Sequence, residues 1–219
     1  MHRIHSNMDM KRVISIEDYH WRANNVYTPV YPFLSKKIIE GFGIVEGICL
    51  DVGCCGGYFG ISMATLTNLK IILMDIDDTA LKIARAKVSE NNLGDRIQVT
   101  FGDVHEIPLL DSSVNMVISR SSLQFWDDYT KAFGEIFRVL VPGGAAYIGS
   151  GFGNIEIKTE VGKTMREIDP LWGIAKDSNK PEDRVIKLEE AMDKNGICQY
   201  EIINDDGGVW LALRKPSIK

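Results

Sequence analysis

The stretch that decides the fold runs from residue 47 to residue 60 and reads GICLDVGCCGGYFG. Apolar Ile48, Leu50 and Val52 alternate with smaller or polar residues, which is typical of a buried strand in an α/β sheet. The strand ends in an acid, Asp51, and then a cluster of small residues that tolerate positive φ angles and close approach. A strand that runs into a glycine-rich turn and a helix forms a ligand crevice at the carboxyl edge of such a sheet.

The glycine spacing in this loop argues against a dinucleotide. The dinucleotide fingerprint Gly-x-Gly-x-x-Gly, started at Gly53, fails at Cys55 and at Tyr58. Asp51 would also repel a phosphate, whereas it suits a cationic ligand or one rich in hydroxyls and amines. For this loop taken alone, a glycine turn that binds no ligand is the alternative interpretation.

The composition is that of an ordinary globular chain. Its 219 residues are 45% hydrophobic and 25% charged, enough for one domain with a sizeable core. The formal net charge of −5 does not predict a basic groove, so nucleic acid is not an expected partner. We expect no membrane span and no signal peptide, because no long apolar run is present and the first residues are polar.

The cysteines predict free thiols. There is no Cys-x-x-Cys pair with a neighbouring histidine, so no metal site is expected. Adjacent Cys54 and Cys55 would pair only with strain, and Cys49 lies in the buried strand. Free thiols fit a reducing compartment, which makes the cytoplasm the expected location.

A second apolar strand, residues 70–75, also ends in an acid. Asp75 follows Asp51 by 24 residues, about the length of one strand–helix–strand unit. A carboxylate at such a strand end accepts two hydrogen bonds from a ribose diol in dinucleotide folds. Asp77 or Asp78 then caps the next predicted helix.

Further strands and helices alternate along the chain. Residues 96–101 alternate in polarity and predict a third strand, and residues 114–119 predict a fourth. A helix with an apolar stripe follows and is expected to end at the Val-Pro-Gly-Gly turn of residues 141–144, before a fifth strand at 145–149. Asp103 follows the third strand; viewed alone, it is equally well explained as a turn aspartate.

The last part of the chain predicts a cap and a hairpin. Residues 150–180 are less regular and contain an amphipathic helix, as expected for a loop that carries specificity. Pro181 begins a helix, and residues 197–203 and 209–214 predict a closing β-hairpin.

The N-terminal part is rich in aromatic residues. Pro29 and Pro32 are expected to break a long helix, and a shorter helix is predicted to end before Gly41. Packing at the edge of the fold is the expected role of most of these aromatic side chains.

The loop and the features that follow it resemble the class I S-adenosylmethionine-dependent methyltransferases. Asp51, Gly53 and Gly57 match the family's motif Asp-x-Gly-x-Gly-x-Gly, whereas Cys55 stands in place of the middle glycine. The order of the glycine loop, the acid after strand two, the Gly-Asp after strand three and the Pro-Gly-Gly before strand five is specific to the family. The chain most resembles its small-molecule, ubiquinone-biosynthesis-like, type 11 branch.

This resemblance implies an architecture. The fold is expected to be α/β, a Rossmann-like doubly wound sheet of seven strands in the order 3-2-1-4-5-7-6 with strand 7 antiparallel. Residues 1–44 would form an N-terminal helical cap segment. Residues 45–219 would form the S-adenosylmethionine-binding domain, with a substrate cap at 150–180.

The resemblance also implies a site for S-adenosyl-L-methionine. Asp75 would bind the ribose, Asp103 the exocyclic amine of adenine, and the backbone after it the ring edge. Carbonyl groups at the end of strand four would hold the ammonium group of the methionine part. The implied cofactor-binding residues are Asp51, Gly53, Cys54, Cys55, Gly57, Asp75, Ile76, Asp103, Val104, Ser119 and Arg120.

The sequence leaves two interpretations open for each of two side chains, Arg120 and Trp126. Arg120 is either a partner for a carboxylate of cofactor or substrate, or a solvated surface arginine. Trp126 is either a pocket wall or, as is commoner for tryptophan, part of the core.

The resemblance also leaves the cover of the cofactor and the catalytic base open. One of Tyr19, Tyr27 and Tyr31 is expected near the methionine end of the cofactor. His20 and His105 are the candidates for a base, with His105 expected at the surface; a lone histidine is more often structural, so no catalytic residue is assigned.

The sequence therefore favours transfer of the sulfonium methyl group, in line, to a nucleophilic O, N, C or S atom of a small molecule. The expected assembly is a monomer or a homodimer. The alternative is a non-catalytic S-adenosylmethionine-binding sensor or a subunit of a modifying complex. A nicotinamide-dependent enzyme is disfavoured by the broken glycine fingerprint.

Overall fold

The structure is a computed structural model that describes residues 15–170, 172 and 181–217. Its strands are β1 (Ile48–Val52), β2 (Lys70–Asp75), β3 (Ile97–Phe101), β4 (Val114–Arg120), β5 (Leu140–Gly151), β6 (Tyr200–Asp205) and β7 (Gly208–Arg214). Its helices are α1 (Ile16–Asn25), α2 (Val30–Phe42), α3 (Tyr58–Leu66), α4 (Asp78–Glu90), the short 3-10 helix η1 (Leu123–Phe125), α5 (Tyr129–Val139), α6 (Ile155–Ile168) and α7 (Pro181–Lys194).

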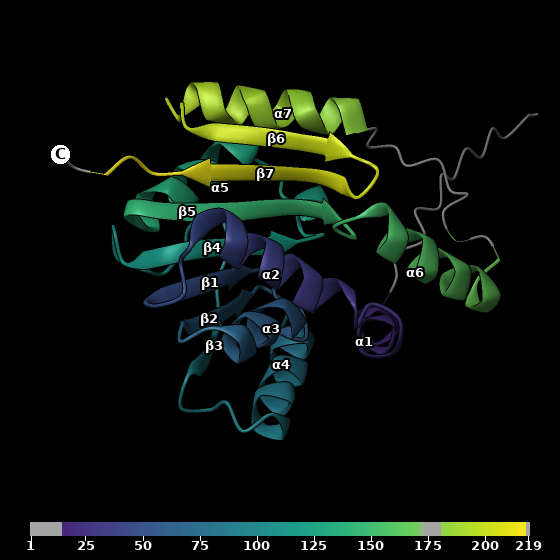
Figure 1. Ribbon diagram of the computed structural model, residues 1–219. Coiled ribbons are helices and arrows are strands. Elements are labelled where there is room, and N and C mark those ends of the chain that lie inside the picture. The colour runs from purple at the N-terminus through teal and green to yellow at the C-terminus, as the bar shows by residue number, and fades with distance from the viewer. Residues whose placement is uncertain (1–14, 171, 173–180, 218–219) are drawn as a thin grey trace, which may run out of the picture.

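All seven strands belong to one sheet, in the order β3-β2-β1-β4-β5-β7-β6 (Figure 1). Strands β1 to β5 pair in parallel, and β7 runs antiparallel to both β5 and β6. The predicted Rossmann-like order with an antiparallel strand 7 is confirmed. Because the strand order reverses between β1 and β4, their carboxyl ends border the position at which doubly wound sheets bind ligands.

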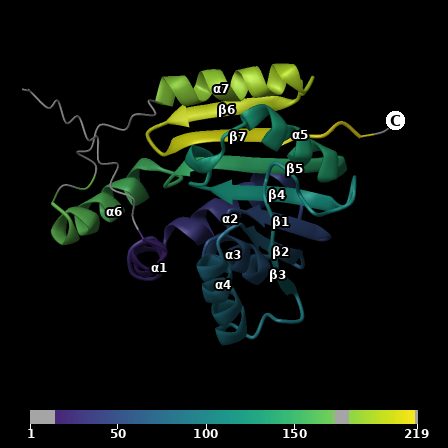
Figure 2. The same cartoon turned by 180° about the vertical axis from the view of Figure 1, so that it is seen from behind.

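Helices cover the two faces of the sheet with separate cores. One apolar cluster includes Leu34, Met63 and Trp210 and joins α2, α3 and α4 to the sheet. The other includes Phe133 and Leu188 and joins α5 and α7 to the opposite face. Helices α1 and α6 lie together beyond one end of the strands in both views (Figures 1 and 2). They therefore flank the carboxyl edge instead of covering a face.

The N-terminal helices differ in one boundary from the prediction. Helix α2 begins after Pro29 and tolerates Pro32, because a residue in the first turn has no intrahelical N–H bond to lose. The helix also passes through Gly41 and ends at Phe42, where Gly43 caps it with a left-handed φ of 68°. The predicted end before Gly41 is therefore wrong.

Residues 141–144 do not form the predicted turn between α5 and the fifth strand, because β5 begins directly after α5. The C-terminal segment explains this difference. Gly143 N–H donates to the carbonyl of Lys215 at 2.9 Å, and Lys215 N–H donates to the carbonyl of Gly144 at 2.8 Å. The ammonium group of Lys215 also donates a hydrogen bond to the carbonyl of Leu140 at 2.7 Å. These long-range bonds extend the strand through a sequence that locally predicts a turn.

Part of the predicted caps lies outside the described residues. The structure describes α6 of the predicted substrate cap at 150–180, but residues 171 and 173–180 of that cap lie outside the described residues. Residues 1–14 of the predicted N-terminal cap segment lie outside them as well. None of the helices in the described part of the chain has the length and apolar character needed to span a membrane.

Candidate active site

The glycine loop turns sharply at the carboxyl end of β1. Backbone N–H groups of Gly53 and Cys54 both donate to the carbonyl of Met74 in β2, at 2.9 and 3.1 Å. Gly53 has a φ of 65°, and a Cβ atom added there would lie 2.6 Å from Cβ of Ser122. Gly57 caps α3 with a φ of 76°. The loop therefore needs glycine at both ends, as the motif predicts.

Cys55, which stands where the motif has its middle glycine, has a left-handed backbone conformation. Its φ is 48°, a conformation that non-glycine residues rarely adopt. In this conformation its N–H donates to Oδ2 of Asp75 at 2.8 Å, while Oδ1 accepts the N–H of Asp77 at 3.0 Å. The loop after β1 is thus hydrogen-bonded to the acid at the end of β2.

Asp75 is held in place with free acceptor capacity. Each of its two oxygens accepts one backbone N–H, and a carboxylate oxygen has lone pairs for a second bond. Burial raises the pKa of Asp75, while hydrogen bonds from Cys55 and Asp77 lower it. The side chain therefore keeps lone pairs that could accept hydrogen bonds from ligand hydroxyls.

Asp51 lies beneath the loop and is almost fully buried, with 1% of its surface exposed. Its Oδ2 accepts the N–H of Gly60 in α3 at 2.8 Å. Burial raises the pKa of Asp51 to about 7, against the effect of the Gly60 hydrogen bond. A nearby cation would favour its ionised form.

The two loop cysteines are not reactive thiolates. Burial raises the pKa of Cys54 well above its ordinary value and raises the pKa of Cys55 to about 12. Both thiols are therefore protonated at neutral pH, and nucleophilic catalysis by them is disfavoured. They act as small side chains that shape the loop.

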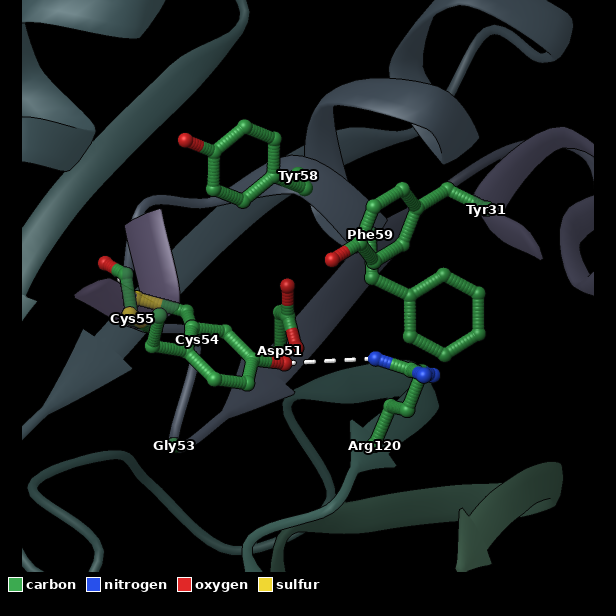
Figure 3. Close-up of a pocket in the computed structure, with 9 residues that line it drawn as sticks. Tyr31, Asp51, Gly53, Cys54, Cys55, Tyr58, Phe59 and Arg120 are labelled. Atoms are coloured by element: carbon green, nitrogen blue, oxygen red, sulfur yellow. Dashed lines mark hydrogen bonds between the residues drawn. The ribbon is translucent and has the colours of Figure 1, made fainter. Parts of the chain in front are cut away.

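A cavity of about 20 Å³ lies between this loop and the N-terminal helices (Figure 3). Such a volume holds about one water molecule, so a larger ligand can enter only if one wall moves. Ala23 is the only described residue of α1 that is fully buried, so α1 is the most weakly packed wall. The residues lining the cavity are Tyr19, Tyr31, Asp51, Gly53, Cys54, Cys55, Tyr58, Phe59 and Arg120.

Arg120 is a buried cation at the end of β4, 8% exposed, so it is not a solvated surface arginine. Its Nε donates to the carbonyl of Gly151 at 3.0 Å and its Nη1 to the hydroxyl of Tyr19 at 3.2 Å. The rings of Tyr27, Tyr31 and Phe152 surround the guanidinium, with centroids 5.2 to 5.5 Å away. No carboxylate of the described residues forms an ion pair with it. A buried, unpaired guanidinium is suited to an anionic ligand group.

Helix α1 is attached to the site by polar contacts. The hydroxyl of Tyr58 contacts Nδ1 of His20 and also donates to the carbonyl of His20 at 3.2 Å. The ring of Tyr58 stacks on Tyr31 with centroids 5.5 Å apart. In Figure 3 the Tyr58 hydroxyl points away from Arg120. His20 therefore contacts the outer side of the aromatic wall, not the cavity.

The predicted adenine-binding residues lie at the neighbouring strand ends. Asp103 and Val104 follow β3, where Phe101 is paired in register with Asp75. The side chain of Asp103 is 53% exposed, Val104 is buried, and Ile76, after β2, is 62% exposed. These residues do not line the cavity beneath α1. They lie further along the same carboxyl edge of the sheet, after β2 and β3.

Ser119 links the carboxyl ends of the neighbouring parallel strands β1 and β4. Its hydroxyl donates to the carbonyl of Val52 at 2.7 Å and lies 2.5 Å from the hydroxyl of Ser122. Trp126 packs on Tyr129 and Phe133 with ring centroids 6.3 and 5.7 Å away, so it belongs to the core. Ser119 thus fixes the loop after β4 against the glycine loop.

Sequence reasoning missed the roles of Tyr58 and His105. Tyr58 directly follows the last glycine of the loop, and this position was the available signal that it borders the site. His105, predicted at the surface, has a side chain only 18% exposed and contacts Asp103. Both contacts depend on partners that a linear pattern does not reveal.

Comparison with known proteins identifies the family. The chain is similar to a Methanococcus maripaludis protein of known crystal structure, described as a candidate S-adenosylmethionine-dependent methyltransferase. The two are 34% identical, the match covers 93% of each chain, and the TM-score is 0.87. This chain belongs to the S-adenosylmethionine-dependent methyltransferases.

The family model and the curated relatives match a smaller part of the chain. A type 11 family model described as a methyltransferase domain matches residues 50–148. An O-methyltransferase from Aspergillus nomiae is 28% identical over 120 residues, which are 54% of this chain and 53% of that protein. A demethylmenaquinone methyltransferase from Staphylococcus aureus is 27% identical over 154 residues, 66% of this chain and 57% of that protein. The chain thus spans about half of the length of these curated relatives.

The residues of this methyltransferase fit S-adenosyl-L-methionine, the cofactor of the family. The cofactor has a zwitterionic amino-acid tail, and the site offers the buried guanidinium of Arg120 and the buried acid Asp51. The hydroxyl of Tyr31 is buried and has no hydrogen-bond partner in the described structure, which leaves a donor for the tail carboxylate. Among the described residues, no three His, Cys, Asp or Glu side chains gather closely enough to hold a metal ion.

Proposed function

We propose that this chain transfers the sulfonium methyl group of S-adenosylmethionine, in line, to a nucleophilic O, N, C or S atom of a small molecule. The observation that supports this most is the row of acids at the ends of adjacent parallel strands. Asp51 is the second-last residue of β1, Asp75 is the last residue of β2 and Asp103 follows β3, beside a glycine loop bonded to Asp75. Membership of the methyltransferase family supports the same assignment.

Each acid would contact a different part of the cofactor. Asp75 accepts hydrogen bonds from the ribose hydroxyls, and Asp103 accepts one from the exocyclic amine of adenine. Ile76 and Val104 lie against the base, and Asp51 faces the cationic tail. Gly53, Cys54, Cys55 and Gly57 let the loop backbone approach the cofactor closely.

Arg120 would bind the carboxylate of the methionine tail, with help from the hydroxyls of Tyr19 and Tyr31. A guanidinium and a carboxylate make charge-assisted hydrogen bonds that are stronger than neutral ones. Carbonyl groups near Ser119 would accept hydrogen bonds from the ammonium group. Of the N-terminal aromatic residues, Tyr19 and Tyr31 are therefore the ones assigned to cover this end.

The cofactor supplies an activated methyl group, and the protein supplies position and a dry site. Positive charge on sulfur disappears as the methyl group leaves, so exclusion of water by α1 favours transfer.

We assign no base, because His20 contacts the outer side of the aromatic wall and His105 contacts Asp103. Residues 1–44 would act as the cap over the cofactor, and residues 150–180 would contribute to the acceptor site.

The partner is a small-molecule acceptor, and we expect a monomer or a homodimer in the cytoplasm. The name of one curated relative includes its acceptor, demethylmenaquinone. This supports a small-molecule acceptor for the present chain. No basic groove is expected from a formal net charge of −5, so a nucleic-acid acceptor is not proposed.

The test is turnover of S-adenosylmethionine to S-adenosylhomocysteine with a panel of small acceptors and a metabolite extract. We expect product only when an acceptor is present, and loss of product in Asp75→Ala. Thermal unfolding with S-adenosylmethionine or NADH is the matched binding measurement. Stabilisation by the first compound without any turnover would favour the binding-only alternative. Stabilisation by NADH alone would contradict the cofactor assignment.

A further inference from the structure

Asp103 and His105 form a close pair just beyond β3. The backbone N–H of His105 donates to Oδ1 of Asp103 at 2.9 Å, and Nδ1 of the ring lies 2.7 Å from the same oxygen. On the other side of the ring, Nε2 accepts the backbone N–H of Asp128 at 3.3 Å. The imidazole therefore bridges the end of β3 to the beginning of α5, whose N-cap is Asp128.

These partners assign the ring proton of His105. A backbone N–H can only donate, so Nε2, which faces one, is the acceptor nitrogen of the neutral ring. The proton then lies on Nδ1, where it donates to Oδ1 of Asp103. Hydrogen bonds from the backbone and the ring of His105 lower the pKa of Asp103, so its carboxylate is ionised at neutral pH.

One oxygen of Asp103 remains available to a ligand. Oδ1 takes both bonds from His105, and no described residue donates to Oδ2. The side chain of Asp103 is 53% exposed, whereas that of His105 is only 18% exposed and held at both nitrogens. The half-buried ring of His105 thus holds the exposed carboxylate of Asp103, whose Oδ2 is left as an acceptor at the edge of the sheet.

We propose that His105 is a positioning residue that fixes Asp103 so that Oδ2 selects a purine with a 6-amino group over one with a 6-oxo group. This inference rests on the proposed function, in which Asp103 binds the adenine. A freely rotating aspartate would lose side-chain entropy when it bound the amine, and the contact with His105 removes that loss. A 6-oxo group would place an acceptor against the carboxylate, which is unfavourable.

The experiment measures base selectivity by calorimetric titration with S-adenosylhomocysteine and with S-inosylhomocysteine. We expect the wild-type protein to prefer the adenosyl compound by about tenfold or more, the range for a hydrogen bond to a charged group. His105→Phe keeps a ring without a donor and should lower this ratio severalfold. His105→Asn offers a side-chain N–H near the position of Nδ1 and should keep most of the ratio. Glu106→Gln, at an exposed neighbour, is the control and should leave it unchanged.

Several outcomes would overturn the proposal. Equal weakening of both ligands in His105→Phe would mean that His105 is only structural. A wild-type protein that binds the adenosyl compound without preferring it would refute the role of Asp103 and leave the cofactor assignment intact. No binding of either compound would instead refute the proposed function, and this inference with it.

A second measurement does not depend on whether a variant folds. Nitrogen-15 NMR of the histidine ring in the wild-type protein should find the neutral form of His105 protonated at Nδ1 and unprotonated at Nε2. A neutral ring protonated at Nε2 and not at Nδ1 would contradict the proposed contact with Asp103, because Nδ1 would then have no proton to donate.

Discussion

Replacing Asp51 by Asn should make the unfolding free energy less dependent on pH. Asp51 is 1% exposed, and burial raises its pKa to about 7, compared with about 3.9 for an unfolded aspartate. This difference of about three units corresponds to roughly 4 kcal/mol. Since the folded protein holds a proton that the unfolded chain has released, stability falls as pH rises from about 4 to about 7 and then levels off.

The assay is urea unfolding followed by circular dichroism at several pH values, without ligand, for both proteins. An asparagine at position 51 can still accept the N–H of Gly60 but does not ionise. The stability difference between Asp51→Asn and wild type should therefore grow with pH over this range, by at most about 4 kcal/mol. Asp78→Asn, at an exposed acid near the same edge, is the control. Parallel pH curves for Asp51→Asn and wild type would refute the assignment of a raised pKa to this carboxyl.

Three further substitutions test the loop and the strand ends. Asp75→Ala should weaken binding of S-adenosylhomocysteine by about 1–3 kcal/mol in calorimetry, since a bonded carboxylate is lost; unchanged affinity would contradict the ribose contact. Cys55→Gly should keep ligand affinity and raise the unfolding free energy by up to about 1 kcal/mol, since its φ of 48° is strained for cysteine. A clear loss of stability would argue against that backbone. Gly53→Val should abolish binding, because a Cβ lies 2.6 Å from Ser122, and full binding would contradict the loop geometry.

The sheet was predictable because local patterns determine it. The strands β1 to β4 correspond to short, mainly apolar or alternating runs of sequence, and the glycine loop identifies β1. The strand order followed from the family resemblance and is confirmed. The beginning of β5, next to α5, was not predictable, because Gly143 and Gly144 exchange backbone hydrogen bonds with Lys215, more than seventy residues later.

The contacts of the N-terminal segment were not predictable for the same reason. Tyr19 reaches Arg120 across 101 positions of sequence, and His20 reaches Tyr58 across 38. Neither pair has a fixed spacing, so a linear pattern could only place the aromatic residues near the site. Arg120 likewise had two equal interpretations until its burial, which depends on the fold, excluded the solvated one.

The most direct test of the central claim is a crystal structure of the protein with S-adenosylhomocysteine. We predict the amino-acid tail between the glycine loop and Arg120, the ribose hydroxyls on Asp75, and the adenine amine on Asp103. A ligand bound elsewhere, or Asp75 turned away from the ribose, would contradict the account.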